Sequence, residues 1–231
     1  MSQLRFVVIV SMFLILAGCA GRHHEPSSAS SSEEGFVPIF NGKNLDGWTY
    51  GMMNGRFNKA GVGYQVDPDR GVVYCTEKDG GNLYTVKEYA NFILRFEFKL
   101  TPNANNGIGI RAPLEGNAAY NGMEIQVLDD SGSKYTALRP EQYHGSIYDL
   151  VAAERGHQKP VGEWNAEQIT ADGRHITVVL NGATIVDANL DDIKDPAKLA
   201  KHPGLWRTNG HIGFLGHGAA VEFRNLRIKT L

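Results

Sequence analysis

Glu124 and Gln126 lie two positions apart in a stretch whose other residues are apolar, Met-Glu-Ile-Gln-Val-Leu. Side chains on a strand point alternately to opposite faces. If this stretch is a strand, one face is anchored in a core and the other carries the carboxylate and the amide. Such groups suit acid–base chemistry or the binding of a polar ligand such as a sugar.

The stretch 105–111 repeats the design, with Asn105 and Arg111 on its polar face and Ile108 and Ile110 on the other. Two glycines stand between the polar residues, and glycine leaves room for a ligand to approach the backbone. The hypothesis is a shared floor of carboxylate, amide and guanidinium groups. The alternative is a solvated sheet face that happens to carry charges.

The segment 129–165 has little regular periodicity but many polar and aromatic side chains. A long irregular segment inside a compact domain is usually functional or disordered, and the aromatic residues favour order. Further along the chain, His217 lies between two glycines, so its ring could reach a cleft. Within the segment, the residues of interest are His144, Tyr148, Asp149, Trp164 and Asn165.

Composition narrows the classes of function. The chain has 231 residues, a formal net charge of -2 and 21% charged residues, with no block rich in Lys or Arg. A nucleic-acid partner is therefore not expected. There is no G-x-S-x-G elbow, phosphate-binding glycine loop, paired C-x-x-C or H-E-x-x-H motif, which argues against a nucleotide cofactor and a serine-hydrolase mechanism.

The beginning of the chain is typical of an exported lipoprotein. Phe6 to Leu16 is apolar apart from one serine, which suits the core of a signal peptide better than a membrane span. The following Leu-Ala-Gly-Cys resembles the bacterial lipobox, in which the cysteine, here Cys19, is lipidated. We expect a signal peptide over 1–18, a flexible tether over 19–35 and a lipid-anchored protein of a bacterial cell envelope. An ordinary secretory signal is the alternative.

The remaining chain, 36–231, predicts one all-β domain built from two packed antiparallel sheets. Its clearest strand is Phe92–Leu100, in which every second residue is apolar. Asn181-Gly182 separates two further strands and is a strong hairpin signal, because both residues tolerate positive φ. Cys75 is expected to be a buried, inert thiol, and Trp48 a core residue.

Five motifs in order resemble the 3-keto-disaccharide hydrolase family, and the resemblance extends from about residue 36 to 231. It implies a concanavalin-like jelly roll of two curved sheets, with the site on the concave face, and secreted or lipid-anchored proteins of sugar-degrading bacteria. Where this chain has Leu215, the family often has a glutamine. The matching motifs are Phe40–Trp48, Asn106–Arg111, Gly122–Asp129, Gly162–Asn165 and Phe223–Ile228.

The resemblance implies cleavage of a 3-keto-glycoside. The ketone acidifies the C2 hydrogen, a base removes it, the C1 leaving group is expelled, and water then adds. Arg111, always charged, suits the oxyanion. Glu124 or His144 is the expected base, and Tyr148 or His217 the expected acid. A divalent metal held by Glu124, Gln126 and a histidine could replace the arginine, although no ligand spacing demands it.

Substrate binding is expected from the remaining polar and aromatic residues of the predicted site, Asn105, Gln126, Asp149, Trp164 and Asn165.

Two other functions remain open. An ordinary glycosidase needs two carboxylates flanking the bond, and Glu124 with Asp149 is a conceivable pair. A lectin-like module would use the same polar floor and Trp164 to bind glycans.

Overall fold

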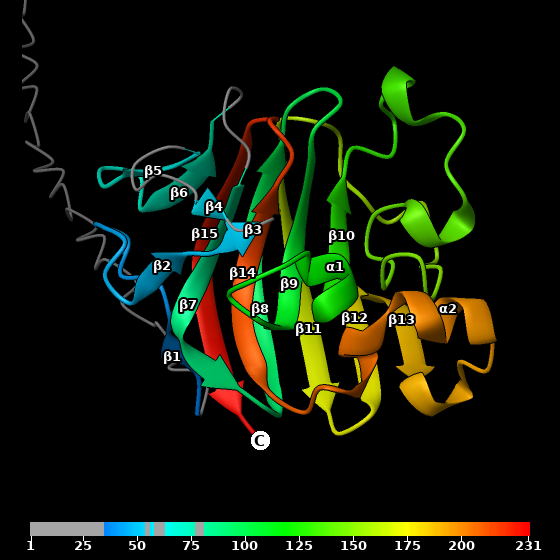
Figure 1. Cartoon of the computed structure of the whole chain (residues 1–231). Helices are drawn as coiled ribbons and strands as arrows, with labels where there is room; N and C mark the ends of the chain where they lie inside the picture. Colours follow the sequence, from blue (N-terminus) through cyan, green and yellow to red (C-terminus); the bar gives the residue numbers. More distant parts are fainter. Residues whose placement is uncertain (1–34, 54–55, 58–62, 77–80) are drawn as a thin grey trace, which may run out of the picture. The chain divides into compact units, whose positions relative to one another are not determined.

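The computed structural model describes residues 35–53, 56–57, 63–76 and 81–231. Within that part of the chain, two antiparallel sheets face each other, and the fold is a jelly-roll-like β-sandwich (Figure 1). The predicted signal peptide, Cys19 and the predicted tether up to residue 34 lie outside the described residues. None of the helices in the described part is long and apolar enough to cross a membrane.

The larger sheet runs in the order β13-β12-β11-β8-β15-β6-β5, with β1 paired to β15. The smaller sheet runs β10-β9-β14-β7-β2, and β3 (Met52–Met53) pairs with β4 (Arg56–Phe57). The larger sheet consists of β1 (Val37–Pro38), β5 (Tyr64–Asp67), β6 (Val72–Cys75), β8 (Phe92–Leu100), β11 (Trp164–Asp172), β12 (His175–Leu180), β13 (Ala183–Asn189) and β15 (Val221–Thr230). The smaller sheet consists of β2 (Trp48–Tyr50), β7 (Gly81–Tyr89), β9 (Asn105–Ala112), β10 (Met123–Leu128) and β14 (Gly210–Gly216).

The helices are short and belong to the connections between strands. Two are α-helical, α1 (Ala118–Asn121) and α2 (Pro196–Lys201). The 3-10 turns are η1 (Ser133–Tyr135), η2 (Pro140–Gln142), η3 (Leu190–Asp192) and η4 (Pro203–Trp206).

The core lies between the two sheets and follows the predicted alternation. Phe96 and Phe98 of β8 are buried on the inner face, opposite Ile125 of β10. Phe214 of β14 stacks on Phe223 of β15 with ring centroids 4.2 Å apart, which joins the sheets. The strand predicted at Phe92–Leu100 is therefore confirmed, as is the apolar inner face of β10.

Local predictions also hold at the hairpin and at the thiol. Asn181 and Gly182 join β12 to β13 with φ of 50° and 91°. Cys75 is fully buried, and burial raises the pKa of its thiol to about 11. Trp48 is buried and stacks on Phe214, with ring centroids 5.2 Å apart. The hairpin forms because both turn residues adopt positive φ. The pKa of the thiol rises because burial removes water from it.

The outward face of the smaller sheet is covered rather than open. Figure 1 shows α1 lying across β9 and β10. Ala118 of α1 packs there in a small apolar cluster with Tyr84, Ala112 and Leu215. A segment after η2 pairs along the free edge of β10, where the N–H of Tyr148 donates to the carbonyl of Glu124 at 2.9 Å. These two elements turn a sheet face into the wall of a pocket.

Candidate active site

Glu124 projects from β10 onto the outward face of the smaller sheet, where only 4% of it is exposed. Its side chain lies across Gly107 of β9, so closely that a Cβ there would overlap the carboxyl group. Leu215 fills the space over Gly109 in the same way, with its Cδ2 3.3 Å from where a Cβ would stand. The expectation that these glycines admit a ligand is therefore wrong, because they admit side chains of the protein itself.

Glu124 opens onto a cavity of about 120 Å³. A single carboxylate, that of Glu124, lies among the described residues that line it. The walls come from β7, α1 and its N-cap, β10, the segment after η2 and the end of β14. The lining residues are Asn82, Asn117, Ala118, Ala119, Tyr120, Glu124, Tyr148, Leu215, Gly216 and His217.

Three ionisable side chains that line this cavity, those of Glu124, Tyr148 and His217, have pKa values shifted in favour of their uncharged forms. Burial raises the pKa of Glu124 to about 8, and its Oε1 has no hydrogen-bond partner among the described residues. His217 sits at the exposed rim, where partial loss of hydration, with a smaller effect from Lys134, lowers the pKa of its imidazole. At neutral pH the carboxyl is mostly protonated and the imidazole mostly neutral.

Tyr148 is the third predicted catalytic residue at the cavity. It is half-buried, and its Oη accepts a hydrogen bond of 3.1 Å from Nε2 of Gln142. Burial raises the pKa of the phenol, and the hydrogen bond from Gln142 opposes part of that rise. The structure thus brings together three of the five residues predicted to be catalytic, namely Glu124, Tyr148 and His217.

Arg111 does not share the floor with Glu124, and that expectation is wrong. Its φ of 49° interrupts the strand alternation of β9, at a point where the register to β14 also shifts. The guanidinium is buried and donates to the carbonyl of Ala90 at 3.1 Å and to Oδ1 of Asn91 at 3.3 Å. It joins connections at the end of the sheet and does not line the cavity.

His144 lies in the interior between the sheets, away from the predicted floor. Its ring packs against Phe98 with centroids 5.0 Å apart, and its Nδ1 accepts from the N–H of Leu128 at 3.3 Å. Nε2 lies 3.2 Å from a carboxylate oxygen of Glu167, and both side chains are buried. The prediction of His144 as the base at this cavity is wrong, because the segment pairing with β10 turns the ring inward.

Asp149 follows Tyr148 but turns away from the cavity, with a φ of 61°. Its buried carboxylate forms ion pairs with Arg139 and, at 2.5 Å, with Lys201 of α2. Burial is the largest single effect and by itself would raise the pKa of Asp149. Lys201 and Arg139 together outweigh burial, so the pKa of Asp149 is lowered. Asp149 therefore fastens the cavity wall and is not a second carboxylate facing Glu124.

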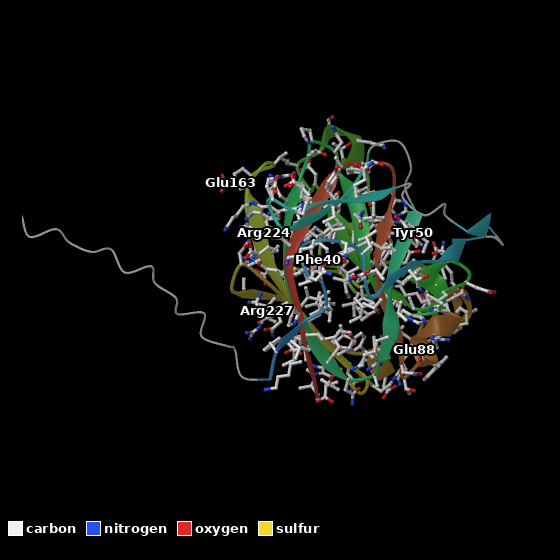
Figure 2. The ribbon with its side chains drawn as sticks, turned by 90° about the vertical axis from the view of Figure 1, so that its left-hand side faces the viewer. Phe40, Tyr50, Glu88, Glu163, Arg224 and Arg227 are labelled. Atoms are coloured by element: carbon white, nitrogen blue, oxygen red, sulfur yellow. The ribbon has the colours of Figure 1, made fainter. Side chains whose placement is uncertain are left out.

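Trp164 and Asn165 also lie away from the cavity. Trp164 is on the outward face of the larger sheet, where Lys99 and Arg224 lie over its ring at 5.0 and 3.9 Å from the centroid. Figure 2 shows Arg224 on the outer side of β15. Asn165 is buried, and its Oδ1 accepts from the N–H of Lys159 and from Nδ2 of Asn181, both at 2.8 Å. Their predicted contact with substrate has no support in these positions.

Gln126 and Asn105 share the outward face with Glu124 but do not line the cavity. Gln126 is opposite Gly107 in the register of β9 and β10, so it lies beside the carboxyl of Glu124. Its Nε2 donates to the carbonyl of Gln142 at 3.3 Å. The Oε1 of Gln126 and the Oδ1 of Asn105 are buried without a hydrogen-bond partner in the described part of the chain.

Sequence patterns overlooked three residues that line the cavity, Asn82, Asn117 and Tyr120. Asn117 caps α1 by accepting from the N–H of Ala119 at 3.0 Å. An asparagine before Ala-Ala-Tyr is a helix-start signal that could have revealed this element. Asn82 alternates with Tyr84 along β7, but nothing in the sequence sets that strand beside β14.

The sequence does not decide whether the protein has a metal site. Across residues 35–53, 56–57, 63–76 and 81–231, no group of three or more His, Cys, Asp or Glu side chains is arranged to hold a metal ion.

Comparison with known proteins first places the fold. A protein of Bacillus subtilis with a galectin-like fold superposes with a TM-score of 0.55 at 12% identity, covering 84% of this chain and 94% of that one. A candidate glycosyl hydrolase of Parabacteroides distasonis is closer, with a TM-score of 0.70 and 29% identity over 85% of this chain and 99% of that one.

The family follows from the sequence match. The family model of the 3-keto-alpha-glucoside-1,2-lyase-like domain matches residues 35–229, and the chain belongs to this family. A 3-keto-disaccharide hydrolase of Bacteroides thetaiotaomicron is 27% identical, over 86% of this chain and 79% of the relative. The predicted family is confirmed.

Proposed function

We propose that the protein cleaves 3-keto-glycosides by elimination of the C1 substituent followed by addition of water. Membership of the family and the name of the Bacteroides relative support this substrate class. The observation that carries the proposal is the cavity at Glu124. It presents one buried carboxyl with an unpartnered oxygen, together with a neutral imidazole and a phenol, around a cavity of about 120 Å³.

The pKa values favour a division of roles opposite to the one expected from sequence. His217, mostly neutral, takes the C2 proton, and the electrons of that bond form the enolate of the C3 ketone. Glu124, mostly protonated, gives its proton to the departing C1 oxygen, leaving a C1=C2 double bond. Glu124 then takes a proton from the water that attacks C1, and the imidazolium returns one to C2. Each group ends in its starting state, and a positioned acid or base typically contributes ~10²–10⁴-fold.

An ordinary glycosidase fits the cavity less well. That mechanism requires two carboxyl groups flanking the bond, about 5 to 9 Å apart. The cavity has one carboxyl among its described lining residues, and Asp149 is held by Arg139 and Lys201. Elimination needs no second carboxyl, because the substrate's own ketone stores the negative charge.

The test compares 3-keto-glucosides with matching unoxidised glycosides in D₂O. We expect turnover of the 3-keto substrates only, with deuterium at C2 of the product at early times. A parallel incubation of the free 3-keto sugar measures spontaneous exchange. Rapid cleavage of plain glycosides without deuterium at C2 would contradict the proposal and favour two-carboxylate hydrolysis. Glycan binding without turnover of either class would favour a lectin.

The pH profile separates the two assignments of roles. If Glu124 is the acid and His217 the base, kcat/KM rises with pH through the lowered pKa of His217 and falls above about pH 8, the pKa of Glu124. If Glu124 is instead the base, kcat/KM rises through about pH 8. Profiles measured from pH 5 to 10 on a substrate with a chromogenic leaving group distinguish these outcomes.

We also propose that the protein is anchored to a bacterial membrane through a lipid on Cys19, at the end of Leu-Ala-Gly-Cys. Replacing Cys19 by Ser is expected to release the protein from the membrane fraction. Mass spectrometry of the native protein measures the lipid directly. A C19S variant that fractionates like the wild type, together with an unlipidated native protein, would contradict the anchor.

A further inference from the structure

The orientation of the Gln142 side chain is fixed by the backbone of its own turn. The N–H of Arg139 donates to Oε1 of Gln142 at 3.1 Å, across the η2 turn. Because a backbone N–H can only donate, the atom facing it must be the amide oxygen. The other end of the amide is therefore the NH₂ group, and it lies 3.1 Å from Oη of Tyr148.

That arrangement decides what the hydroxyl of Tyr148 can do. A phenol has one proton and can also accept. Since Gln142 donates to Oη, the proton of Tyr148 must point elsewhere. Tyr148 lines the cavity, and within the described part of the chain its hydroxyl donates to no other residue. The proton is therefore available to a ligand in the cavity.

The position of this hydroxyl is held relative to Glu124. The N–H of Tyr148 donates to the carbonyl of Glu124 at 2.9 Å, so the two residues share one backbone ladder. The carbonyl of Gln142 accepts from Nε2 of Gln126 at 3.3 Å, which ties the η2 turn to the same strand. The carboxyl of Glu124 and the phenol of Tyr148 are therefore held at the cavity by backbone segments that are hydrogen-bonded to each other.

We propose that Tyr148 donates a hydrogen bond to the C3 oxygen of the 3-keto substrate, and that Gln142 is the positioning residue that aims it. The assignment rests on the proposed function. As the C2–H bond breaks, the C3=O bond becomes a C3–O⁻ bond, and the hydrogen bond strengthens toward that oxygen. As the C1–O bond breaks, the ketone reforms and the proton is still on Tyr148. This is the role first expected of Arg111, which the fold places elsewhere.

The decisive variant is Gln142→Glu, which keeps size and shape. A carboxylate at that position accepts from the N–H of Arg139 and also from Tyr148, so it turns the phenol proton away from the cavity. Loss of one oxyanion donor typically lowers the rate by ~10²–10³-fold. We expect Tyr148→Phe to lower kcat by that range and Q142E by roughly 10- to 100-fold, with KM little changed.

Two readouts distinguish positioning from a merely structural role. The first is C2–H exchange in D₂O, followed by NMR, on a 3-keto-1,5-anhydro sugar, which has no C1 leaving group; both variants should slow this exchange. The second is the double variant, in which Q142E should add nothing to Y148F. The control is Gln65→Glu, the same change at a second Gln–Tyr pair on the larger sheet, away from the cavity, where Oε1 of Gln65 accepts from the hydroxyl of Tyr74 at 2.7 Å.

Several results would overturn the assignment. They are an unchanged kcat in Y148F, an unchanged kcat in Q142E with a native melting temperature, or a Q142E loss that is equally large in the Y148F background. Because Y148F removes only a hydroxyl, it decides the matter even if Q142E folds poorly. A wild-type protein that neither turns over 3-keto substrates nor exchanges C2–H would instead refute the proposed function, and the assignment with it.

Discussion

The outward faces of the two sheets are both polar, but they treat their polar groups differently. On the larger sheet, Glu222 pairs with Lys99 at 2.7 Å and with Arg70 at 3.0 Å. Arg224 pairs with Glu97 at 2.7 Å and lies over the ring of Trp164. These groups are partly exposed and have partners or water, as expected for a solvated sheet face.

On the smaller sheet, several buried polar atoms of the outward face have no hydrogen-bond partner among the described residues. An unpartnered buried polar atom costs free energy, about 1–3 kcal/mol each. Of these atoms, the carboxyl oxygen of Glu124 belongs to a residue that lines the cavity, so this group is held ready for a ligand at the expense of stability. The atoms are Oε1 of Glu124, Oε1 of Gln126, Oδ1 of Asn105 and Oη of Tyr84.

Charge on a sheet face therefore does not by itself mark a site. The charged side chains on the outward face of the larger sheet are partly exposed and form ion pairs with one another, which identifies a structural surface. On the outward face of the smaller sheet, the buried carboxyl of Glu124 has an oxygen without a partner among the described residues and lines a cavity, which identifies a candidate site. Four experiments test this difference between the two faces.

The largest effect is expected from Glu124→Gln, with Glu222→Gln as the matched control on the other sheet. E124Q removes the acid at the cavity and should lower kcat/KM by ~10²–10⁴-fold. E222Q removes a partly exposed ion-pair partner and should change kcat/KM by less than about twofold. Steady-state kinetics on a 3-keto-glucoside measures both. Similar losses in the two variants would show that the contrast between the faces carries no functional meaning.

The same pair of variants should differ in how stability depends on pH. The folded-state pKa of Glu124, about 8, lies above its ordinary value of 4.5, so its contribution to stability is full below pH 4.5 and is lost as pH rises through 8. At pH 9, E124Q should therefore be more stable than the wild type by up to roughly 4 kcal/mol, with little difference near pH 4.5.

Glu222 should behave oppositely and weakly. Burial alone would raise its pKa, but Lys99 and Arg70 outweigh burial and lower it, so its stabilisation is present above its unfolded pKa and lost in acid. E222Q should thus be slightly less stable than the wild type at pH 9, by under about 1 kcal/mol. Urea denaturation at both pH values decides the signs. An E124Q protein less stable than the wild type at pH 9 would refute the raised pKa.

A third experiment compares the two faces of the smaller sheet itself. Ile125 is fully buried against the core, so Ile125→Ala should destabilise the protein by about 2–5 kcal/mol. Val86 of β7 is 60% exposed, and Val86→Ala should change the free energy of unfolding by less than about 0.5 kcal/mol. Denaturant titrations measure both, and equal effects would mean that the inner face is misassigned.

The smallest effect is expected from Trp164→Ala on the larger sheet. The change removes contacts of Lys99 and Arg224 with the ring, each worth about 0.5–1 kcal/mol at an exposed site. A loss of roughly 1 kcal/mol in stability with unchanged kcat/KM is expected. A large rise in KM would instead restore the prediction that Trp164 binds substrate.

Much of the fold was determined by local sequence signals. Alternation places Phe96 and Ile125 in the core, because period-two patterning admits only one inward face. Asn181 and Gly182 define a hairpin, because few other residues accept positive φ at both positions. Alternation also places Glu124 on the face opposite that core. The glycines on either side of His217 predicted that its ring could reach a cleft.

Which polar residues lie together depends on the packing of segments that are distant in the sequence. Arg111 left the predicted floor because a positive φ at the end of β9 breaks the alternation, and a strand pattern contains no signal for such a bulge. His144 and Asp149 were placed by a segment that pairs with β10, a contact between residues distant in sequence. The protonation of Glu124 likewise depends on burial by α1 and Leu215, which come from other parts of the chain. Sequence patterns fix the face of a strand, whereas desolvation and hydrogen-bond partners are set by what packs on that face.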